Sequence, residues 1–258
     1  MTANFNLGKE SDQMANHDQI NEVYYGRAMG TASQRANRER IHWICEQAAG
    51  KKILDIGCSQ GIVSILLGRT GFEVTGIDVE SVAIEYAVKE LQKEEDEVSE
   101  KVKFIHANAL TYDFGAEQYN TVIASEIIEH LTQPHLLYEK IFEILIPNGR
   151  VIITTPFGIM DYQDHKRTYC LSSLLNEIHP YFLPQQVHFI GNWICLTAER
   201  RKKITQRSLS VLDYSQVEQA ENKFIEIERH WMDISKTCSE KNRQLMAKIE
   251  LLKKSKTD

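Results

Sequence analysis

Two glutamates and two histidines have the residue types and spacing of a divalent-metal site. Glu126, Glu129 and His130 occur within the segment SEIIEHL, and His165 follows in DYQDHKR. A spacing of i, i+3 and i+4 places side chains on one face of a helical turn, which predicts that the first three lie together. Carboxylate oxygens and imidazole nitrogens are ligands that suit Mg²⁺ or Mn²⁺. The alternative is that the histidines act as a general base or have only a structural role.

A glycine-containing loop forms a second candidate site. The apolar run at residues 52–56 (KILDI) is followed by Gly57 and Gly61. Because glycine has no Cβ, a ligand can approach the backbone closely at such positions. The G-x-G-x-x-G fingerprint of nicotinamide cofactors is absent, since Ser59 stands at its middle position.

Asp78 extends this second site. It comes directly after the next apolar run, residues 73–77, and a carboxylate there can accept hydrogen bonds from both hydroxyls of an adenosine ribose. The glycine loop and Asp78 together therefore predict a site for an adenosine-containing cofactor.

The elements that must position these residues alternate between strand and helix. Short apolar runs predict strands, and apolar residues at helical spacing predict helices between them. The strands are expected at residues 52–56, 73–77, 102–106, 121–124 and 150–154, and the helices at 31–49, 61–70, 81–94 and 136–145. This order predicts an α/β fold, a doubly wound and mostly parallel sheet with helices on both faces. Ligands of such sheets bind beyond the carboxyl ends of the strands, where both candidate sites lie.

Residues 50–155 resemble the class I S-adenosylmethionine (SAM)-dependent methyltransferases, which are Rossmann-like. The glycine-rich first motif of that family is similar to the segment from Asp55 to Gly61, and its ribose-binding acid is similar to Asp78. Two positions depart from the family pattern: Ser59 replaces the commoner middle glycine, and Asn108 stands where an aspartate usually lies near the adenine. The resemblance implies SAM as cofactor and the following binding residues: Asp55, Gly57, Cys58, Gly61, Asp78, Val79, Asn108, Ala109 and Ser125.

The E-x-x-E-H element followed by D-H-K resembles the small-RNA 3′-end 2′-O-methyltransferases, and its first half resembles the quinone-pathway O-methyltransferases. The resemblance implies that Glu126, Glu129, His130 and His165 hold Mg²⁺ or Mn²⁺. The metal would bind two vicinal hydroxyls and lower the pKa of the one that attacks the methyl group. Catalytic roles are then expected for Glu129, His130 and His165.

Several acceptors fit such a site. We expect a hydroxyl of a vicinal diol on a sugar of a bacterial surface glycan, because the arrangement is similar to modular polysaccharide-assembly proteins. A 3′-terminal RNA ribose and a quinone-type catechol are the alternatives. The net charge of −6 and pI near 5.9 make a nucleic-acid partner less favourable. A scaffold built on a degenerate methyltransferase domain is the alternative outside the enzymes.

Composition and patterning divide the chain into three regions. Residues 1–30 are expected to be a flexible N-terminus whose end, residues 21–30, forms a lid through Tyr24, Tyr25 and Arg27. The methyltransferase domain is expected at residues 31–205, with 156–200 covering the acceptor through aromatic side chains or burying them in the core. Five scattered cysteines, no leader-like segment and no apolar run of about 20 residues favour a cytoplasmic protein that could attach to a membrane only peripherally.

Residues 210–255 carry an apolar heptad repeat. Val217, Phe224, Trp231, Cys238, Leu245 and Leu252 recur every seven residues, with Ala220, Ile227 and Ile234 at the companion position. This spacing is typical of a coiled coil, which would join copies of the chain or a fused partner, although Lys241 and Lys248 interrupt the companion positions. A single helix packed on the catalytic domain is the alternative.

Overall fold

The computed structural model describes residues 19–158, 164–204 and 214–254 and confirms a mostly parallel α/β fold. The described part of the chain contains a seven-stranded sheet of order β3-β2-β1-β4-β5-β7-β6. Its strands are β1 (Lys52–Ile56), β2 (Glu73–Asp78), β3 (Val102–His106), β4 (Tyr119–Ser125), β5 (Leu145–Pro156), β6 (Phe182–Ile190) and β7 (Trp193–Arg200). In this order, neighbouring strands from β3 through β2, β1 and β4 to β5 pair in parallel. Strand β7 pairs antiparallel with both β5 and β6.

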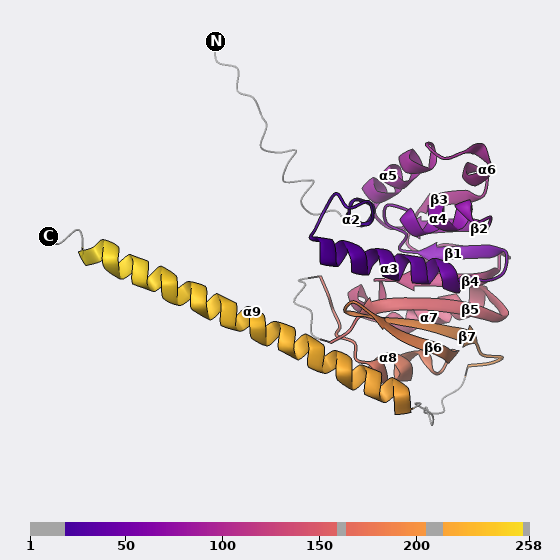
Figure 1. Cartoon of the computed structure of the whole chain (residues 1–258). Coiled ribbons are helices and arrows are strands. Elements are labelled where there is room, and N and C mark those ends of the chain that lie inside the picture. Colours follow the sequence, from indigo (N-terminus) through magenta and orange to yellow (C-terminus); the bar gives the residue numbers. More distant parts are fainter. Residues whose placement is uncertain (1–18, 159–163, 205–213, 255–258) are drawn as a thin grey trace, which may run out of the picture. The chain divides into compact units, whose positions relative to one another are not determined.

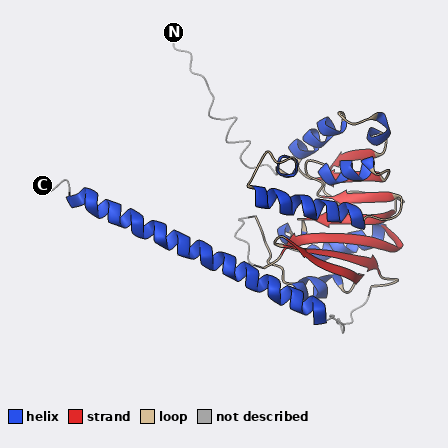
Figure 2. Cartoon of the chain, in the orientation of Figure 1, coloured by secondary structure: helices blue, strands red, loops and turns tan. Residues whose placement is uncertain are grey.

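Helices cover both faces of this sheet (Figures 1 and 2). They are α2 (Ile20–Tyr24), α3 (Thr31–Gln47), α4 (Ile62–Arg69), α5 (Ser81–Leu91), α6 (Asp96–Ser99), α7 (Pro134–Ile144) and α8 (Leu171–Ile178). The apolar core under α3 and α4 includes Ile44 and Leu67, both fully buried, packed on the side chains of Ile53 and Ile123. The two central strands, β1 and β4, pair in parallel beneath this core, and the loops that follow them carry the glycine motif and the E-x-x-E-H element.

The segment after β5 differs from the expectation. Instead of only covering the acceptor, residues 182–200 complete the sheet as the antiparallel pair β6 and β7. Tyr169 and Phe182 are buried in the core, which was the alternative for the aromatic residues of this region. No helix of the described residues is long and apolar enough to cross a membrane.

The chain divides into two compact units, residues 1–210 and 211–258. The second contains α9 (Tyr214–Lys254), a continuous helix of 41 residues. The predicted C-terminal helix is therefore present. The five cysteines are all free thiols.

Candidate active site

The glycine loop is shaped by its own neighbours. Gly57 and Gly61 have φ values of 69° and 82°, in the left-handed region that favours glycine. A Cβ on Gly57 would lie 1.8 Å from Cδ1 of Ile127, and one on Gly61 would lie 2.6 Å from Cζ of Phe104. The glycines are therefore required for close packing inside the chain, independently of any ligand. Ser59, between these glycines, also has a left-handed φ, of 45°.

Asp78 is anchored beside this loop. Its Oδ2 accepts a hydrogen bond from the backbone N–H of Ser59 at 2.8 Å, and its Oδ1 accepts one from Glu80 at 2.9 Å. The carboxylate is thus held between the loop after β1 and the end of β2. Val79 is exposed next to it. The structure therefore brings the predicted ribose-binding acid and the predicted glycine loop together.

The remaining predicted cofactor residues have different surroundings. Asn108 is exposed beyond β3, where its Oδ1 accepts a hydrogen bond from the N–H of Leu110 at 2.9 Å, while Ala109 is buried. Asp55 is buried and accepts a 2.7 Å hydrogen bond from the hydroxyl of Ser64, so its carboxyl faces α4. Burial raises the pKa of Asp55 from 3.8 to about 7. Cys58 is also buried, and burial raises the pKa of its thiol.

The predicted lid segment contacts the glycine loop through residues that sequence reasoning missed. The backbone N–H of Asn21 donates to Oε1 of Gln60 at 3.0 Å, and its side-chain amide donates to the carbonyl of Gln60 at 3.1 Å. Asn21 and Gln60 are both buried. The three predicted lid residues make other contacts. The hydroxyl of Tyr24 is hydrogen-bonded to Nε2 of His42. The guanidinium of Arg27 lies over the ring of Tyr25 and forms an ion pair with Glu22.

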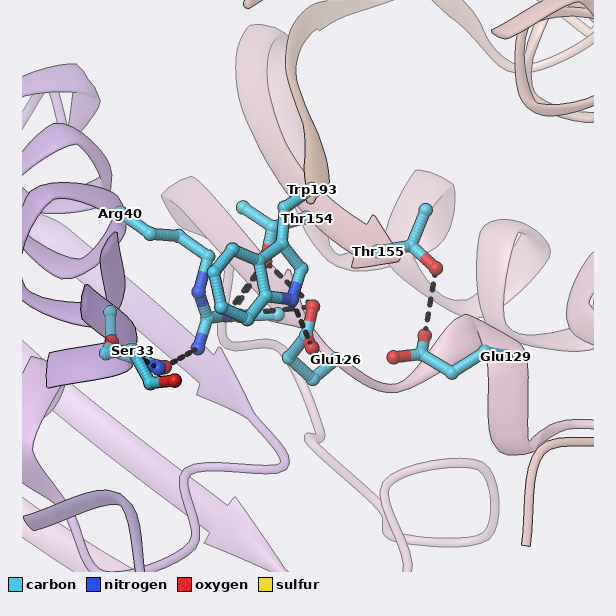
Figure 3. A network of polar contacts seen from close by, with 9 residues as sticks. Ser33, Arg40, Glu126, Glu129, Thr154, Thr155 and Trp193 are labelled. Carbon is cyan, nitrogen blue, oxygen red and sulfur yellow. Dashed lines mark hydrogen bonds and ion pairs between the residues drawn. The ribbon is translucent and has the colours of Figure 1, made fainter. Parts of the chain in front are cut away.

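Glu126 belongs to a polar network between α3 and the sheet (Figure 3). Its Oε1 lies 3.5 Å from Nη1 of Arg40, and its Oε2 accepts a hydrogen bond from the indole N–H of Trp193. Arg40 is buried, lies over the Trp193 ring, and donates to the hydroxyls of Ser125 and Thr154 at 2.7 and 3.1 Å. Burial raises the pKa of Glu126, and the nearby Arg40 opposes this effect.

The backbone of this segment differs from the expected helical turn. Glu126 has φ 59°, and the helical part is a single 3-10 turn at Ile128–His130. Glu126 therefore does not continue the turn that carries Glu129 and His130, and a common helical face does not explain the cluster. Ser125, a predicted cofactor residue, is bonded to Arg40 and to the Thr154 hydroxyl.

Glu129, His130 and His165 lie close together at the carboxyl edge of the sheet. Each offers one ligand atom, and these atoms all lie within 4.8 Å of one another. One oxygen of the buried Glu129 accepts a 3.0 Å hydrogen bond from the Thr155 hydroxyl, whereas Oε1 has no hydrogen-bond partner among the described residues. The backbone carbonyl of Glu129 accepts hydrogen bonds from the backbone N–H groups of Lys166 and Arg167. These bonds hold the loop that carries His165 against this turn.

The titratable groups of this cluster influence one another. Burial, followed by the charge of Glu126, raises the pKa of Glu129 to about 8. Burial and the neighbouring His130 lower the pKa of His165. His130 Nδ1 lies 3.2 Å from a carboxylate oxygen of Asp164. Three of the four predicted metal ligands are therefore grouped, and Glu126 lies beside them with its oxygens engaged by Arg40, Thr154 and Trp193.

The chain matches a known protein family. A family model described as a methyltransferase domain matches residues 19–193, which is more than half of the chain and includes both candidate sites. The chain belongs to this methyltransferase domain family. The predicted class I SAM-dependent methyltransferase is thereby confirmed at the level of the family.

Curated relatives of this methyltransferase are named ubiquinone biosynthesis O-methyltransferase. The protein of that name from Pseudomonas putida (strain GB-1) is 36% identical over 160 residues, which are 61% of this chain and 65% of the relative. The one from Pseudomonas fluorescens (strain Pf0-1) is 36% identical over 121 residues, 46% of this chain and 51% of the relative. The chain thus spans between half and two thirds of the length of these relatives.

Solved structures share the fold of this methyltransferase. Magnesium protoporphyrin IX methyltransferase from Synechocystis PCC 6803 superposes with a TM-score of 0.60 at 13% identity, covering 75% of this chain and 95% of that one. The [4+2]-cyclase SpnF gives 0.58 at 15% identity, covering 70% and 85%. Because one of these two proteins is a cyclase, the likeness establishes the fold alone.

Proposed function

We propose that this methyltransferase transfers the methyl group of SAM to one hydroxyl of a vicinal diol, and that the acceptor is a catechol of the quinone-precursor class. The observation that carries the proposal is the grouping of Glu129, His130 and His165 beside the glycine loop. The names of the curated relatives favour a catechol over the sugar of a surface glycan, which we had expected from the sequence.

A divalent cation such as Mg²⁺ or Mn²⁺ fits the residues of this cluster. The buried Oε1 of Glu129 has no hydrogen-bond partner among the described side chains, and leaving a buried carboxylate oxygen unpaired is costly unless something binds it. A carboxylate and two imidazoles supply the mixed oxygen and nitrogen ligands that such ions accept. Glu129, His130 and His165 would hold the ion, with Glu126 as the fourth predicted ligand beside them.

When bound, the ion supplies Lewis acidity that lowers the pKa of an acceptor hydroxyl and orients the diol. The chain's own residues supply the rest. Asp78, Asn108 and the loop from Gly57 to Gly61 would bind the adenosine and methionine parts of SAM. Because the sulfonium already activates its methyl group, the protein mainly has to align the acceptor oxygen with it.

The histidines can take part in proton removal. A lowered pKa keeps His165 neutral near pH 7, which is the form that binds a cation or accepts a proton. Asp164 can orient the His130 ring through Nδ1, which leaves Nε2 for a ligand or a proton. The acceptor proton would thus leave through an imidazole at the carboxyl edge of the sheet.

The direct test is transfer of labelled methyl from SAM to a panel of acceptors. The panel contains a catechol, a rhamnose-type glycan and an RNA oligonucleotide with a free 3′-terminal diol, each with Mg²⁺, with Mn²⁺ and with chelator. We expect transfer to the catechol, lost with chelator and restored by the metal. Transfer to the glycan or the RNA in its place would overturn the acceptor class. Transfer that resists the chelator would overturn the metal.

Two variants locate the activity. His165→Asn should remove most transfer, whereas His135→Asn, at an exposed histidine on α7, should not. Equal activity of these two variants would mean that the cluster is not the reacting centre. Failure of the chain to bind SAM would favour the scaffold alternative.

A further inference from the structure

Helix α9 has large apolar side chains that are exposed to solvent. Phe224 is 51% exposed, Trp231 45% and Leu245 57%. A solvated helix normally has an all-polar exposed surface, and clusters of this kind mark an interaction site. Phe224, Ile227, Trp231, Ile234 and Cys238 follow one another at alternating steps of three and four residues, and all of them except Ile227, which is 8% exposed, are exposed. This spacing is that of the a and d positions of a coiled coil.

The apolar stripe formed by these residues continues past Cys238 if the step that follows Cys238 is four residues instead of three. The next positions are then Asn242, Leu245 and Ile249, so that Lys241 and Lys248 move out of the seam. The distance from Trp231 to Asn242 is eleven residues, the repeat that a stutter introduces into a heptad pattern. The lysines that interrupt a strict heptad therefore flank a continuous stripe from Phe224 to Ile249.

We propose that α9 pairs with α9 of a second copy of this chain as a parallel, in-register two-stranded coiled coil. Asn242 occupies an a position, where a single asparagine can pair with itself across the seam and specify register and oligomeric state. This device works only when the same position of the partner helix faces it. An identical helix in parallel orientation satisfies this condition along the whole stripe.

One charge pair beside the stripe favours the same orientation. In a parallel pair, each g position faces the e position five residues further along the partner, which brings Lys223 to Glu228 of the second copy. In an antiparallel pair, g positions face g positions, and Lys223 would face Lys241 or Lys248. Like charges at these positions are repulsive, so the charge of Lys223 favours the parallel arrangement.

The mass of the full chain in solution tests the pairing. Sedimentation equilibrium should give twice the monomer mass of 29.7 kDa at micromolar concentration. Trp231→Glu places a charge in the seam and should raise the dissociation constant at least about 100-fold. Met232→Glu adds the same charge at an exposed position outside the stripe and should leave the dimer unchanged. A monomer for the unmodified chain, or equal effects of both variants, would overturn the proposal.

Disulfide cross-linking tests the orientation. In a Cys170→Ser background, the native Cys238 should cross-link to Cys238 of the second copy under mild oxidation. With Cys238→Ser added, Ala220→Cys in the seam should also cross-link to itself, whereas Lys236→Cys on the outer face should react far more slowly. Circular dichroism should confirm that each variant keeps its helix. A dimer in which Ala220→Cys fails to cross-link would contradict the parallel register. The proposal is independent of the acceptor proposed above, because none of these measurements involves methyl transfer.

Discussion

The Glu126 carboxylate lies 3.5 Å from the guanidinium of Arg40, and this pairing distinguishes Glu126 from Glu129, three residues further along the chain. Glu126 is held by Arg40, Thr154 and Trp193, whereas Glu129 has a buried oxygen without a hydrogen-bond partner among the described residues. The first carboxylate is therefore engaged within the protein, and the second is available to a ligand. Variants of Glu129 and Arg40 test this difference.

Glu129→Gln should reduce kcat/KM for methyl transfer by about 100-fold, because a neutral amide oxygen is a weaker cation ligand than a carboxylate. The fold should not suffer, since the Thr155 hydroxyl can still donate to the amide oxygen and a buried ionisable group is removed. Steady-state kinetics and thermal unfolding measure the two effects. Glu143→Gln, at an exposed position on α7, is the matched control. Full activity in the Glu129 variant would rule out its role as a ligand.

Arg40→Met should lower the free energy of unfolding by about 3 kcal/mol, because it leaves Glu126 without its cation and removes the hydrogen bonds that Arg40 donates to Ser125 and Thr154. Urea denaturation gives the value. Adding Glu126→Gln should recover part of the loss, since the unpaired carboxylate is then gone. A double variant whose loss equals the sum of the two single losses would show that Arg40 and Glu126 do not interact.

Gly57→Ala should destabilise the protein by about 3 kcal/mol, from its positive φ and from the clash with Ile127. Gly115→Ala separates the two causes, because Gly115 also has a positive φ but has no atom within 4 Å of the added Cβ. It should cost only about 1 kcal/mol. Ile127→Ala should partly rescue the Gly57 variant. Equal losses for the two alanine variants would refute the packing role of Gly57.

Asp55→Asn should make the free energy of unfolding less dependent on pH. Because burial raises the folded-state pKa of Asp55 from 3.8 to about 7, the folded chain retains a proton that the unfolded chain releases between these values. The stability contributed by this group is therefore present below the unfolded pKa and is lost as the pH rises towards 7. Between about pH 4 and pH 8, the variant should gain of the order of 2–4 kcal/mol relative to the unmodified protein. Glu85→Gln, at an exposed site on α5, should change the free energy of unfolding by the same amount at every pH. The same pH-independent change for Asp55→Asn would contradict the raised pKa.

The sequence predicts most of the sheet and of the cofactor loop because their signals are local. The apolar run KILDI, the glycines after it and Asp78 after the next run all occur where a parallel strand ends. The grouping of Glu129, His130 and His165 was also predicted, although by a helical turn that Glu126 with φ 59° does not join. The metal itself stays a prediction.

The parts that were missed depend on contacts between distant segments. Arg40 and Trp193 reach Glu126 from α3 and β7, and nothing in the spacing of these residues along the chain indicates that they meet. Strands β6 and β7 were missed because residues 156–200 are unlike the core motifs and were expected to cover the acceptor. β7 pairs antiparallel with both β5 and β6, and this pairing depends on tertiary context that a strand-and-helix alternation does not contain.

The most direct test of the account is methyl transfer to a catechol compared with its analogue that has a single hydroxyl, with Mg²⁺ and after chelation. A site that binds two vicinal hydroxyls through a cation should methylate the catechol at least about 100-fold faster than the analogue, and chelation should abolish that preference. Equal rates for the two acceptors, unaffected by chelation, would contradict metal-assisted methylation of a vicinal diol by Glu129, His130 and His165.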